Sequence, residues 1–372
     1  MVYTWNRIVV KVGTSLLTTT EGDFSSACIT GIVKELCSLR QSGKEIILVT
    51  SGAIGAGMCR LDLKHRPVAI PLKQACAAIG QSYLMNIYEQ LFGEHHQTIA
   101  QILLTHYELA NRRSYLNTYN TLLTLLGYNT IPIINENDTV AVDEIKFGDN
   151  DTLSALVAQL VEADLLILLT DIDGLYSKTP DGKGFGELIP LVEDITPEIV
   201  DMAKGTKNKF ATGGMTTKIA AAQIATTAGV MVMILNGRTS GIIGDALAGK
   251  DCGTTFAAKS DKISSRKRWI MYGLKTSGEI TIDNGAKKAL NQGKSLLPSG
   301  IVEIQGHFEE GDAVIVNDIC GNSLAKGLIN YSKGAIVKIK GKQSSQIEEI
   351  LDYKYSDEII HRDNLVMFEC GE

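Results

Sequence analysis

The chain has 372 residues, which at roughly 150 residues per domain predicts two or three domains and excludes a single small module. Hydrophobic residues make up 44% of the chain and charged residues 21%, a balance typical of a folded globular protein and unlike that of a disordered one. The net charge of -6 disfavours a nucleic-acid-binding protein, because such proteins normally carry a basic excess.

The acidic excess lies entirely in the first part of the chain. From Lys262 onward there are 15 basic and 15 acidic residues, out of 36 and 42 in the whole chain, so residues 1–261 hold the remaining 21 and 27. The C-terminal part therefore has no net charge, whereas residues 1–261 carry the whole net charge of -6.

Cysteine usage and the lack of long apolar segments indicate the compartment. Seven cysteines, an odd number with no CxxC spacing and no histidine cluster, argue against a disulfide framework or a zinc site. No segment approaches the roughly 20 apolar residues needed to span a bilayer, and Lys11 interrupts the apolar start of the chain. We expect a cytoplasmic protein without a targeting segment and without membrane association.

Short β-branched runs alternate with amphipathic stretches through the first two thirds of the chain, which predicts a mostly parallel sheet with helices on both faces. The predicted strands are 8–12, 46–50, 98–104, 130–135, 165–170 and 230–235. The predicted helices are 74–92, 112–126, 152–161 and 216–228. Gly43, Gly127 and Gly229 each follow a helical stretch, and we expect each to cap its helix with a positive φ.

The pattern changes after about residue 250, where a polar stretch leads into short segments broken by glycines. Predicted strands at 279–282, 301–305, 313–317 and 324–329 indicate a small β-rich barrel or sandwich. We place the domain boundary between residues 255 and 275.

Lys11 interrupts the apolar run 8–12, and Gly13, Thr14 and Ser15 follow that run directly. An unpaired ammonium in a buried strand is costly, so the lysine must reach solvent, pair, or meet an anion at the end of the strand. The glycine and the hydroxyls let backbone amides approach a phosphate. The segment predicts a phosphate-binding lysine, with an ordinary edge-strand lysine as the alternative.

Residues 50–57, TSGAIGAG, follow a predicted strand directly. Their glycines are spaced GxxGxG, so the segment lacks the GxGxxG fingerprint of dinucleotide-binding folds. A turn of small residues still offers backbone amides and the Ser51 hydroxyl to an anionic substrate. Tight packing of a helix on a strand would explain the same glycines.

Amides and carboxylates gather in two short segments, 135–138 (NEND) and 148–151 (GDND). A helix N-cap accounts for one Asp or Asn of the second segment but not for three. Carboxylates accept hydrogen bonds from an ammonium and amides donate to a carboxylate. The two segments therefore predict a ligand that carries both groups.

Thr170 and Asp171 close the very apolar strand 165–169, and residues 212–218, TGGMTTK, open a predicted helix. Glycines and hydroxyls before a helix N-terminus favour anion binding, and Lys218 adds a cation beside them. The segment is not a Walker A motif, because three residues separate Gly214 from Lys218. A flexible surface loop is the alternative.

Taken in order, these segments resemble the amino acid kinase family, in particular its members that phosphorylate L-glutamate. The matching stretches are 10–15 (VKVGTS), 49–57 (VTSGAIGAG), 131–138 (IPIINEND), 145–156 (IKFGDNDTLSAL), 168–176 (LLTDIDGLY) and 212–218 (TGGMTTK). Segments between residues 278 and 301 resemble the PUA domain that is appended to many bacterial members. The resemblance covers nearly the whole chain.

The resemblance implies an α/β fold, a three-layer αβα sandwich with a mostly parallel central sheet, followed by a small β-rich PUA domain. On this basis we expect the amino acid kinase domain at residues 1–258, a linker at 259–275, the PUA domain at 276–356 and a C-terminal tail at 357–372.

By position, the resemblance makes Lys11 and Lys218 the phosphate-contacting catalytic lysines and Asp151 the carboxylate that orients them. The positions that it assigns to the amino acid substrate are Ser51, Gly52, Asn135, Asp138 and Asn150. The positions that it assigns to the nucleotide are Lys11, Gly13, Thr170, Asp171, Thr212, Gly213, Gly214, Met215, Thr216, Thr217 and Lys218. It implies ATP and Mg2+ as cofactors, and no protein ligand to a metal is predicted.

The implied reaction transfers the γ-phosphoryl group of ATP to the γ-carboxylate of L-glutamate, the first step of proline biosynthesis. With a reference pKa of about 4.3, this carboxylate is already an anionic nucleophile at neutral pH and needs no general base. The difficulty is the repulsion between two anions, which lysines, helix N-termini and a magnesium ion can offset.

Two alternatives stay open. The first is a related kinase for another acidic metabolite, such as acetylglutamate, aspartate or a carbamate. The second is an RNA-binding protein with an inactive kinase-like domain, since PUA domains elsewhere contact RNA; the neutral C-terminal charge balance and the intact lysine pair count against it. The resemblance also implies feedback inhibition by proline and a homo-oligomer, either a dimer or a tetramer.

Overall fold

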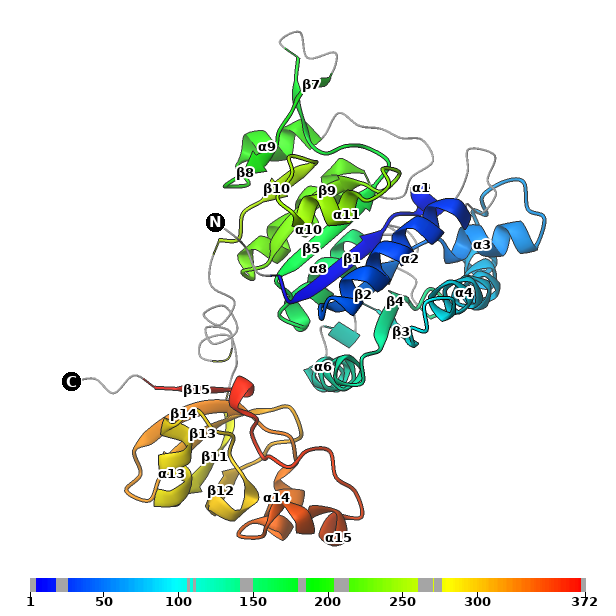
Figure 1. Ribbon diagram of the computed structural model, residues 1–372. Helices are drawn as coiled ribbons and strands as arrows, with labels where there is room; N and C mark the ends of the chain where they lie inside the picture. Colours follow the sequence, from blue (N-terminus) through cyan, green and yellow to red (C-terminus); the bar gives the residue numbers. More distant parts are fainter. Residues whose placement is uncertain are drawn as a thin grey trace. The chain divides into compact units, whose positions relative to one another are not determined.

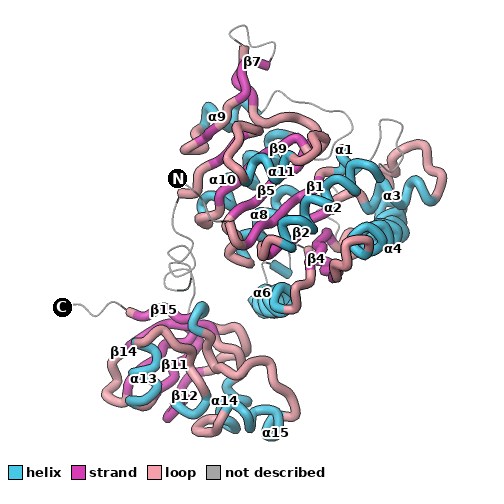
Figure 2. The backbone as a smooth tube through the Cα atoms, viewed as in Figure 1, coloured by secondary structure: helices cyan, strands magenta, loops and turns pink. Residues whose placement is uncertain are grey.

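A computed structural model describes residues 5–17, 26–105, 108–109, 112–140, 150–179, 185–203, 214–259, 270 and 276–368. The chain forms two compact units, Met1–Lys262 and Ile263–Glu372. Figure 1 shows the elements of each unit, and Figure 2 shows how strands and helices alternate in the first one. No helix in these described ranges has the length and apolar character needed to cross a membrane.

The first unit is built on an eight-stranded sheet with the strand order β3-β4-β2-β1-β5-β9-β10-β8. Its strands are β1 (Arg7–Val12), β2 (Glu45–Thr50), β3 (Ile99–Leu104), β4 (Ile131–Glu136), β5 (Leu165–Thr170), β8 (Leu191–Val192), β9 (Met231–Asn236) and β10 (Thr254–Phe256). The helices are α1 (Thr14–Leu17), α2 (Ser26–Gln41), α3 (Ala53–Arg60), α4 (Ile70–Gly93), α6 (Arg112–Gly127), α8 (Asn150–Leu160), α9 (Pro197–Met202), α10 (Met215–Thr227) and α11 (Ile242–Leu247). Strands β6 (Tyr176–Lys178) and β7 (Phe185–Leu188) form a separate hairpin.

The central strands are buried on both faces, and alternate residues of one strand pack into two different cores. Val9 packs with α6, α8 and α10, whereas Ile8 and Val10 pack with α2, α4 and α11. Because successive side chains of a strand point to opposite faces, the two cores are the two interfaces of a helix–sheet–helix sandwich. The predicted three-layer architecture is confirmed (Figure 1).

Strand β1 lies at the centre of the sheet, between β2 and β5, and pairs with both in parallel. The chain adds β2, β4 and β3 on one side of β1 before it returns to the other side with β5 and β9. In open parallel sheets ligands bind beyond the carboxyl ends of the strands, where the connections diverge in this way. This topology points to the carboxyl ends of β1, β2 and β5.

Helices α3 and α4 approach each other closely through small residues. A Cβ atom added to Gly57 would lie 1.8 Å from the carbonyl oxygen of Cys76, and one added to Gly80 would lie 1.8 Å from that of Ala53. Neither position tolerates a side chain, so Gly57 serves helix packing. Tight packing of a helix on a strand is the alternative interpretation of segment 50–57. Gly57 does serve tight packing, but α3 packs there on another helix, α4, and not on a strand.

Six predicted strands and four predicted helices correspond to β1–β5, β9, α4, α6, α8 and α10, and the largest shift of a boundary is four residues, at the start of α4. Gly43 and Gly229 have positive φ, as expected, at 87° and 80°. The expectation for Gly127 is wrong. Gly127 is the last residue of α6, and the left-handed position is taken two residues later by Asn129, with φ 59°. Asparagine is one of the few residues other than glycine that adopts this conformation at low cost.

The second unit is a mixed five-stranded sheet with the order β12-β11-β13-β14-β15. Its elements are β11 (Thr276–Ile282), α13 (Asn284–Asn291), β12 (Ile301–Gly306), β13 (Ala313–Asp318), β14 (Ser323–Leu328), α14 (Lys333–Ile339), α15 (Ile347–Leu351) and β15 (Leu365–Met367). The four strands predicted here are present, and they share one hydrophobic core with α13, α14 and α15.

Residues 357–368, the described part of the predicted tail, belong to the fold of the second unit and are not a separate segment. Strand β15 pairs antiparallel with β14, and Ile359 and Ile360 are fully buried in the core of this unit. The backbone N–H of Leu296 donates a hydrogen bond to the carbonyl oxygen of Ile360 over 2.9 Å. The compact fold therefore continues through at least Met367, because the sheet needs this last strand to cover its edge.

Candidate active site

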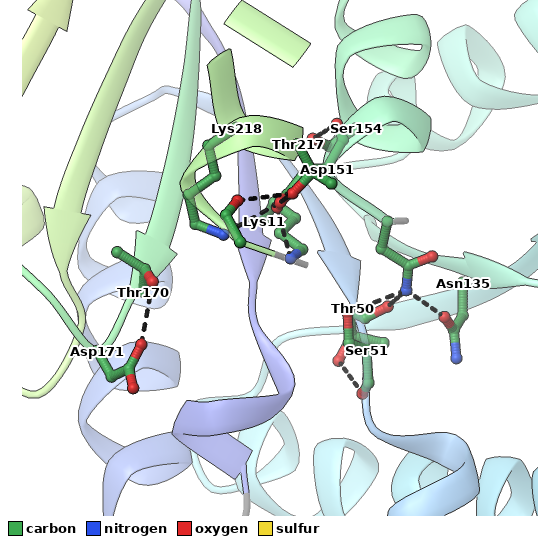
Figure 3. A network of polar contacts seen from close by, with 12 residues as sticks. Lys11, Thr50, Ser51, Asn135, Asp151, Ser154, Thr170, Asp171, Thr217 and Lys218 are labelled. Atoms are coloured by element: carbon green, nitrogen blue, oxygen red, sulfur yellow. Dashed lines mark hydrogen bonds and ion pairs between the residues drawn. The ribbon is translucent and has the colours of Figure 1, made fainter. Parts of the chain in front are cut away.

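Two lysines from distant parts of the sequence meet one carboxylate at the carboxyl end of β1 (Figure 3). The Nζ atom of Lys11 lies 2.6 Å from Oδ1 of Asp151, and the Nζ atom of Lys218 lies 3.0 Å from Oδ2. The hydroxyl of Thr217 donates to the same Oδ2 over 2.7 Å. The predicted catalytic residues Lys11, Asp151 and Lys218 are therefore brought together.

This ion cluster is buried, with exposed fractions of 5% for Lys11, 1% for Asp151 and 5% for Lys218. Burial by itself raises the pKa of Asp151, but the two neighbouring ammonium groups and the hydrogen bonds outweigh it and hold the pKa well below its usual range. Asp151 is thus an anion that separates two cations and is too weak a base to accept a proton at neutral pH.

The sequence places the three charges here for local reasons. Lys11 and Val9 are two residues apart in β1, so their side chains point to the same face of the sheet. Val9 packs towards α8 and α10 on this face, and the Lys11 side chain therefore enters the same layer. Asp151 lies in the first turn of α8, and Lys218 lies in the first turn of α10. Two helix N-termini, each with a partial positive charge, therefore border the cluster, which suits it to an anion.

A second, uncharged cluster begins one residue away, at Asn150. Its Nδ2 atom lies 2.6 Å from the carbonyl oxygen of Thr50, 3.0 Å from Oγ of Ser51 and 2.9 Å from Oδ1 of Asn135. Three of the predicted amino-acid-binding residues, Ser51, Asn135 and Asn150, therefore meet at the carboxyl ends of β2 and β4 and the start of α8.

The hydrogen bonds determine which atom of each amide is the donor. A carbonyl oxygen only accepts, so the Asn150 atom beside Thr50 is nitrogen, and its amide oxygen is left as an acceptor. Asn135 Oδ1 receives hydrogen bonds from Asn150 and from the backbone N–H of Glu136, which leaves the Asn135 amide nitrogen as a donor. The cluster thus offers both an acceptor and a donor to a ligand.

Helix α4 supports this cluster through two residues that the sequence analysis missed. Gln81 Oε1 accepts a hydrogen bond from Asn135 Nδ2 over 2.7 Å, and the Tyr88 hydroxyl lies 2.8 Å from Oγ1 of Thr50. Burial raises the pKa of Tyr88, so its hydroxyl keeps its proton. Polar residues on an otherwise ordinary helix carry no sequence signal, since their importance depends on which strand the helix covers.

Comparison with known proteins agrees with this geometry. The amino acid kinase family matches residues 6–236, the part of the chain that contains both clusters. The chain belongs to the amino acid kinase family. The PUA domain matches residues 278–351, within the second unit. Both family predictions are confirmed.

Curated relatives match over almost their full length. A glutamate 5-kinase of Caldanaerobacter subterraneus is 51% identical over 98% of this chain and 99% of its own. Those of Moorella thermoacetica and Geobacter sulfurreducens are 47% and 49% identical, over 97% of this chain and 96% and 97% of their own.

Among the described residues predicted to bind nucleotide, Thr170 and Asp171 lie at the end of β5, and Met215 to Lys218 form the first turn of α10. Thr170 ends β5, and its hydroxyl lies 3.3 Å from Oδ1 of Asp171. A Cβ atom added to Gly13 would lie 3.3 Å from the Leu169 carbonyl oxygen, which is a tight contact, and 3.8 Å from the Lys11 Nζ atom, which is an ordinary van der Waals distance.

The loop before α10 is described only from Gly214, the N-cap residue of that helix. Met215 is buried, and the Thr216 hydroxyl donates to the Ala203 carbonyl oxygen over 3.3 Å. The Thr217 hydroxyl instead faces Asp151. Thr212 and Gly213 lie outside the described residues.

Two further predicted residues flank the amide cluster. Gly52 is the N-cap residue of α3 with φ 93°, and a Cβ atom there would lie 2.9 Å from a methyl carbon of Leu17. The positive φ favours glycine here, whereas the contact with the end of the Leu17 side chain could be relieved by a shift of that side chain. Asp138 lies half-buried in the turn after β4.

Within the described parts of the chain, no group of three or more His, Cys, Asp or Glu side chains could hold a metal ion. Both oxygens of Asp151 are engaged by lysine ammonium groups. The ion cluster therefore presents two ammonium groups around one carboxylate whose oxygens are both engaged.

Proposed function

We propose that the chain is an ATP-dependent glutamate 5-kinase that phosphorylates the γ-carboxylate of L-glutamate and so catalyses the first step of proline biosynthesis. The observation that carries the proposal is the convergence of Lys11 and Lys218, from the two ends of the kinase domain, on Asp151. The agreement over nearly the whole chain with relatives that are named glutamate 5-kinase supports the choice of substrate.

In the proposed reaction, a γ-carboxylate oxygen of glutamate attacks the γ-phosphorus of ATP. A new O–P bond forms while the bond from phosphorus to the β–γ bridging oxygen breaks, and ADP leaves with the electron pair. No proton moves, because the carboxylate is ionised at neutral pH. This agrees with the chemistry of Asp151, whose depressed pKa makes it unsuited to be a general base.

Lys11 and Lys218 would contact the phosphate chain and neutralise the charge that develops on the transferring group. Asp151 would hold the two ammonium groups close together in the free protein and fix their positions before the nucleotide arrives. The N-terminus of α10 would add backbone N–H groups on the same side.

Magnesium would arrive with the nucleotide, held by its phosphate oxygens and by water; a protein carboxylate of the kind that kinases commonly add would have to come from outside the ion cluster. When bound, it supplies further positive charge to the transferring phosphoryl group. Both oxygens of Asp151 already face lysine ammonium groups, so Asp151 would not serve as a magnesium ligand.

The amide cluster would bind the amino acid end of glutamate. The free amide oxygen of Asn150 suits the α-ammonium, together with the carboxylate of Asp138. The donor nitrogen of Asn135 and the hydroxyl of Ser51 suit a carboxylate. Because Asn150 and Asp151 are consecutive, this arrangement would set the γ-carboxylate beside the phosphate-binding lysines.

The direct test measures ADP release with L-glutamate, N-acetylglutamate, L-aspartate and carbamate at saturating MgATP, with hydroxylamine to trap an acyl phosphate. We expect turnover and hydroxamate formation with L-glutamate and a kcat/KM for the other three that is lower by orders of magnitude. Preference for another member of this panel would refute the assignment of the substrate. Inhibition by proline and assembly into a homo-oligomer remain predictions.

A further inference from the structure

Gln81 combines a hydrogen bond to the amide cluster with an unsatisfied buried donor. Its Oε1 atom accepts from Asn135 Nδ2 over 2.7 Å. Its Nε2 atom is buried and has no hydrogen-bond partner among the described residues. A buried donor without a partner costs roughly 1–3 kcal/mol, so glutamine is an unfavourable choice for stability at this position.

The assignment of the Gln81 oxygen and nitrogen follows from a chain of hydrogen bonds. The Thr50 carbonyl fixes the amide of Asn150, and the Asn150 nitrogen in turn fixes Oδ1 of Asn135 as an acceptor. Asn135 must then donate to Gln81 through nitrogen, which places the Gln81 oxygen towards Asn135. Turning the Gln81 amide around would bring two donors together.

The position of Gln81 is also rigid. The preceding residue, Gly80, is pressed against α3, where a Cβ atom would lie 1.8 Å from the Ala53 carbonyl oxygen. Two turns further along α4, Tyr88 is fully buried and lies within hydrogen-bond distance of Thr50. Helix α4 is therefore held on both sides of Gln81 and cannot shift to relieve the unsatisfied amide.

We propose that Gln81 is a positioning residue for glutamate recognition, an inference that rests on the proposed function. By accepting one N–H of Asn135, it holds the Asn135 side chain at the end of β4 with its second N–H available for a substrate carboxylate. Residues that reduce stability in order to fix a neighbouring side chain are expected at functional sites. Gln81 itself need not touch the substrate, since its free nitrogen is covered.

The test replaces Gln81 by methionine, which has a similar length and neither donates nor accepts a strong hydrogen bond. For Gln81→Met we expect the KM for L-glutamate to rise roughly 3- to 10-fold, the equivalent of one hydrogen bond. The KM for ATP and the kcat should stay within about twofold of the wild type. The thermal midpoint should change little, because the substitution removes the unsatisfied donor of Gln81 but leaves one N–H of Asn135 without its acceptor.

The matched control is Gln90→Met, the same substitution at an exposed position of the same helix. It should change neither KM nor the thermal midpoint. A Gln81→Met protein that is less stable, or that does not fold, would overturn the proposal by showing that glutamine serves the fold. An unchanged glutamate KM in a stable variant would overturn it as well.

A double-mutant cycle with Asn135 separates positioning from direct contact. If Gln81 acts through Asn135, adding Gln81→Met to Asn135→Ala should raise the glutamate KM by less than about twofold. The same 3- to 10-fold rise in both backgrounds would show a direct contact with the substrate and refute the positioning role. Failure of the wild-type protein to phosphorylate glutamate would instead refute the proposed function, and with it this inference.

Discussion

The two halves of the candidate site, which meet at the consecutive residues Asn150 and Asp151, are organised in different ways. On the phosphate side, two cations share one buried anion, and charge holds the group together. On the amino acid side, neutral amides and hydroxyls form a network in which each hydrogen bond fixes the direction of the next.

The difference corresponds to what each half must do. Phosphate oxygens carry a large charge and are bound by point charges in several orientations, so positively charged groups near the transferring phosphoryl suffice. A zwitterionic amino acid has to be bound in one orientation, and the direction of hydrogen bonds provides that selectivity. We therefore expect changes on the phosphate side to lower kcat and changes on the amino acid side to raise the KM for glutamate.

The largest effect should come from the lysine pair. Lys11→Ala and Lys218→Ala should each lower kcat by a factor of about 100 or more, because each removes a cation that stabilises the transferring group. Steady-state ADP release measures this loss, with Lys34→Ala on the exposed face of α2 as the control. Near-normal turnover in both site variants would refute the proposed mechanism.

Asp151→Asn should reduce the stability of the kinase domain by about 3 kcal/mol or more at neutral pH, because it leaves two buried cations without an anion. The pKa of Asp151 in the folded protein lies below its unfolded value, so its contribution is complete above about pH 5 and is lost as the pH falls below about 4. Thermal midpoints of the wild type and of Asp151→Asn, measured from neutral pH to below about pH 4, test whether the advantage of the wild type shrinks on acidification. A wild-type advantage that grows on acidification would contradict it.

Asn150→Ala should raise the KM for L-glutamate about 10- to 100-fold while the KM for ATP changes little, since a charged ligand group loses its hydrogen-bond partner. Asp138→Ala should act in the same direction. Asn120→Ala, at an exposed position of α6, serves as the control. If the glutamate KM is unchanged in both site variants, the amino acid binds elsewhere.

The smallest effect should come from Thr217, whose hydroxyl supports Asp151. Thr217→Val should lower kcat about 3- to 10-fold through the loss of one hydrogen bond, and Thr217→Ser, which keeps the hydroxyl, should restore most of the activity. Equal activity in the two variants would show that the hydroxyl does not position the carboxylate.

Local patterns in the sequence were sufficient for the main elements of the kinase domain. The apolar runs of β1, β2, β4 and β5 predict central strands because such strands are buried on both faces. Patterns were insufficient where the signal is short or depends on pairing. Strand β15 has only three residues, and its place in the sheet depends on its partner β14.

The sequence by itself determined which side chains are predicted to carry the proposed chemistry. Lys11 stands out because a charge within a buried strand needs a partner. Asp151 stands out because its segment holds more amides and carboxylates than one N-cap needs, and Lys218 because it follows glycines and hydroxyls at a helix start. The resemblance to a known family then implied their roles. None of these signals states which charges meet.

The resemblance implied that Asp151 orients both lysines, but only the tertiary structure decided the geometry of the contact between Lys11 and Asp151 and the contact between Asn135 and Gln81. These contacts join residues 140 and 54 positions apart in the sequence, and they exist because β1, β4, α4 and α8 meet at one end of a sheet. The direction of an amide also depends on its neighbours, since a single asparagine or glutamine can donate or accept equally well.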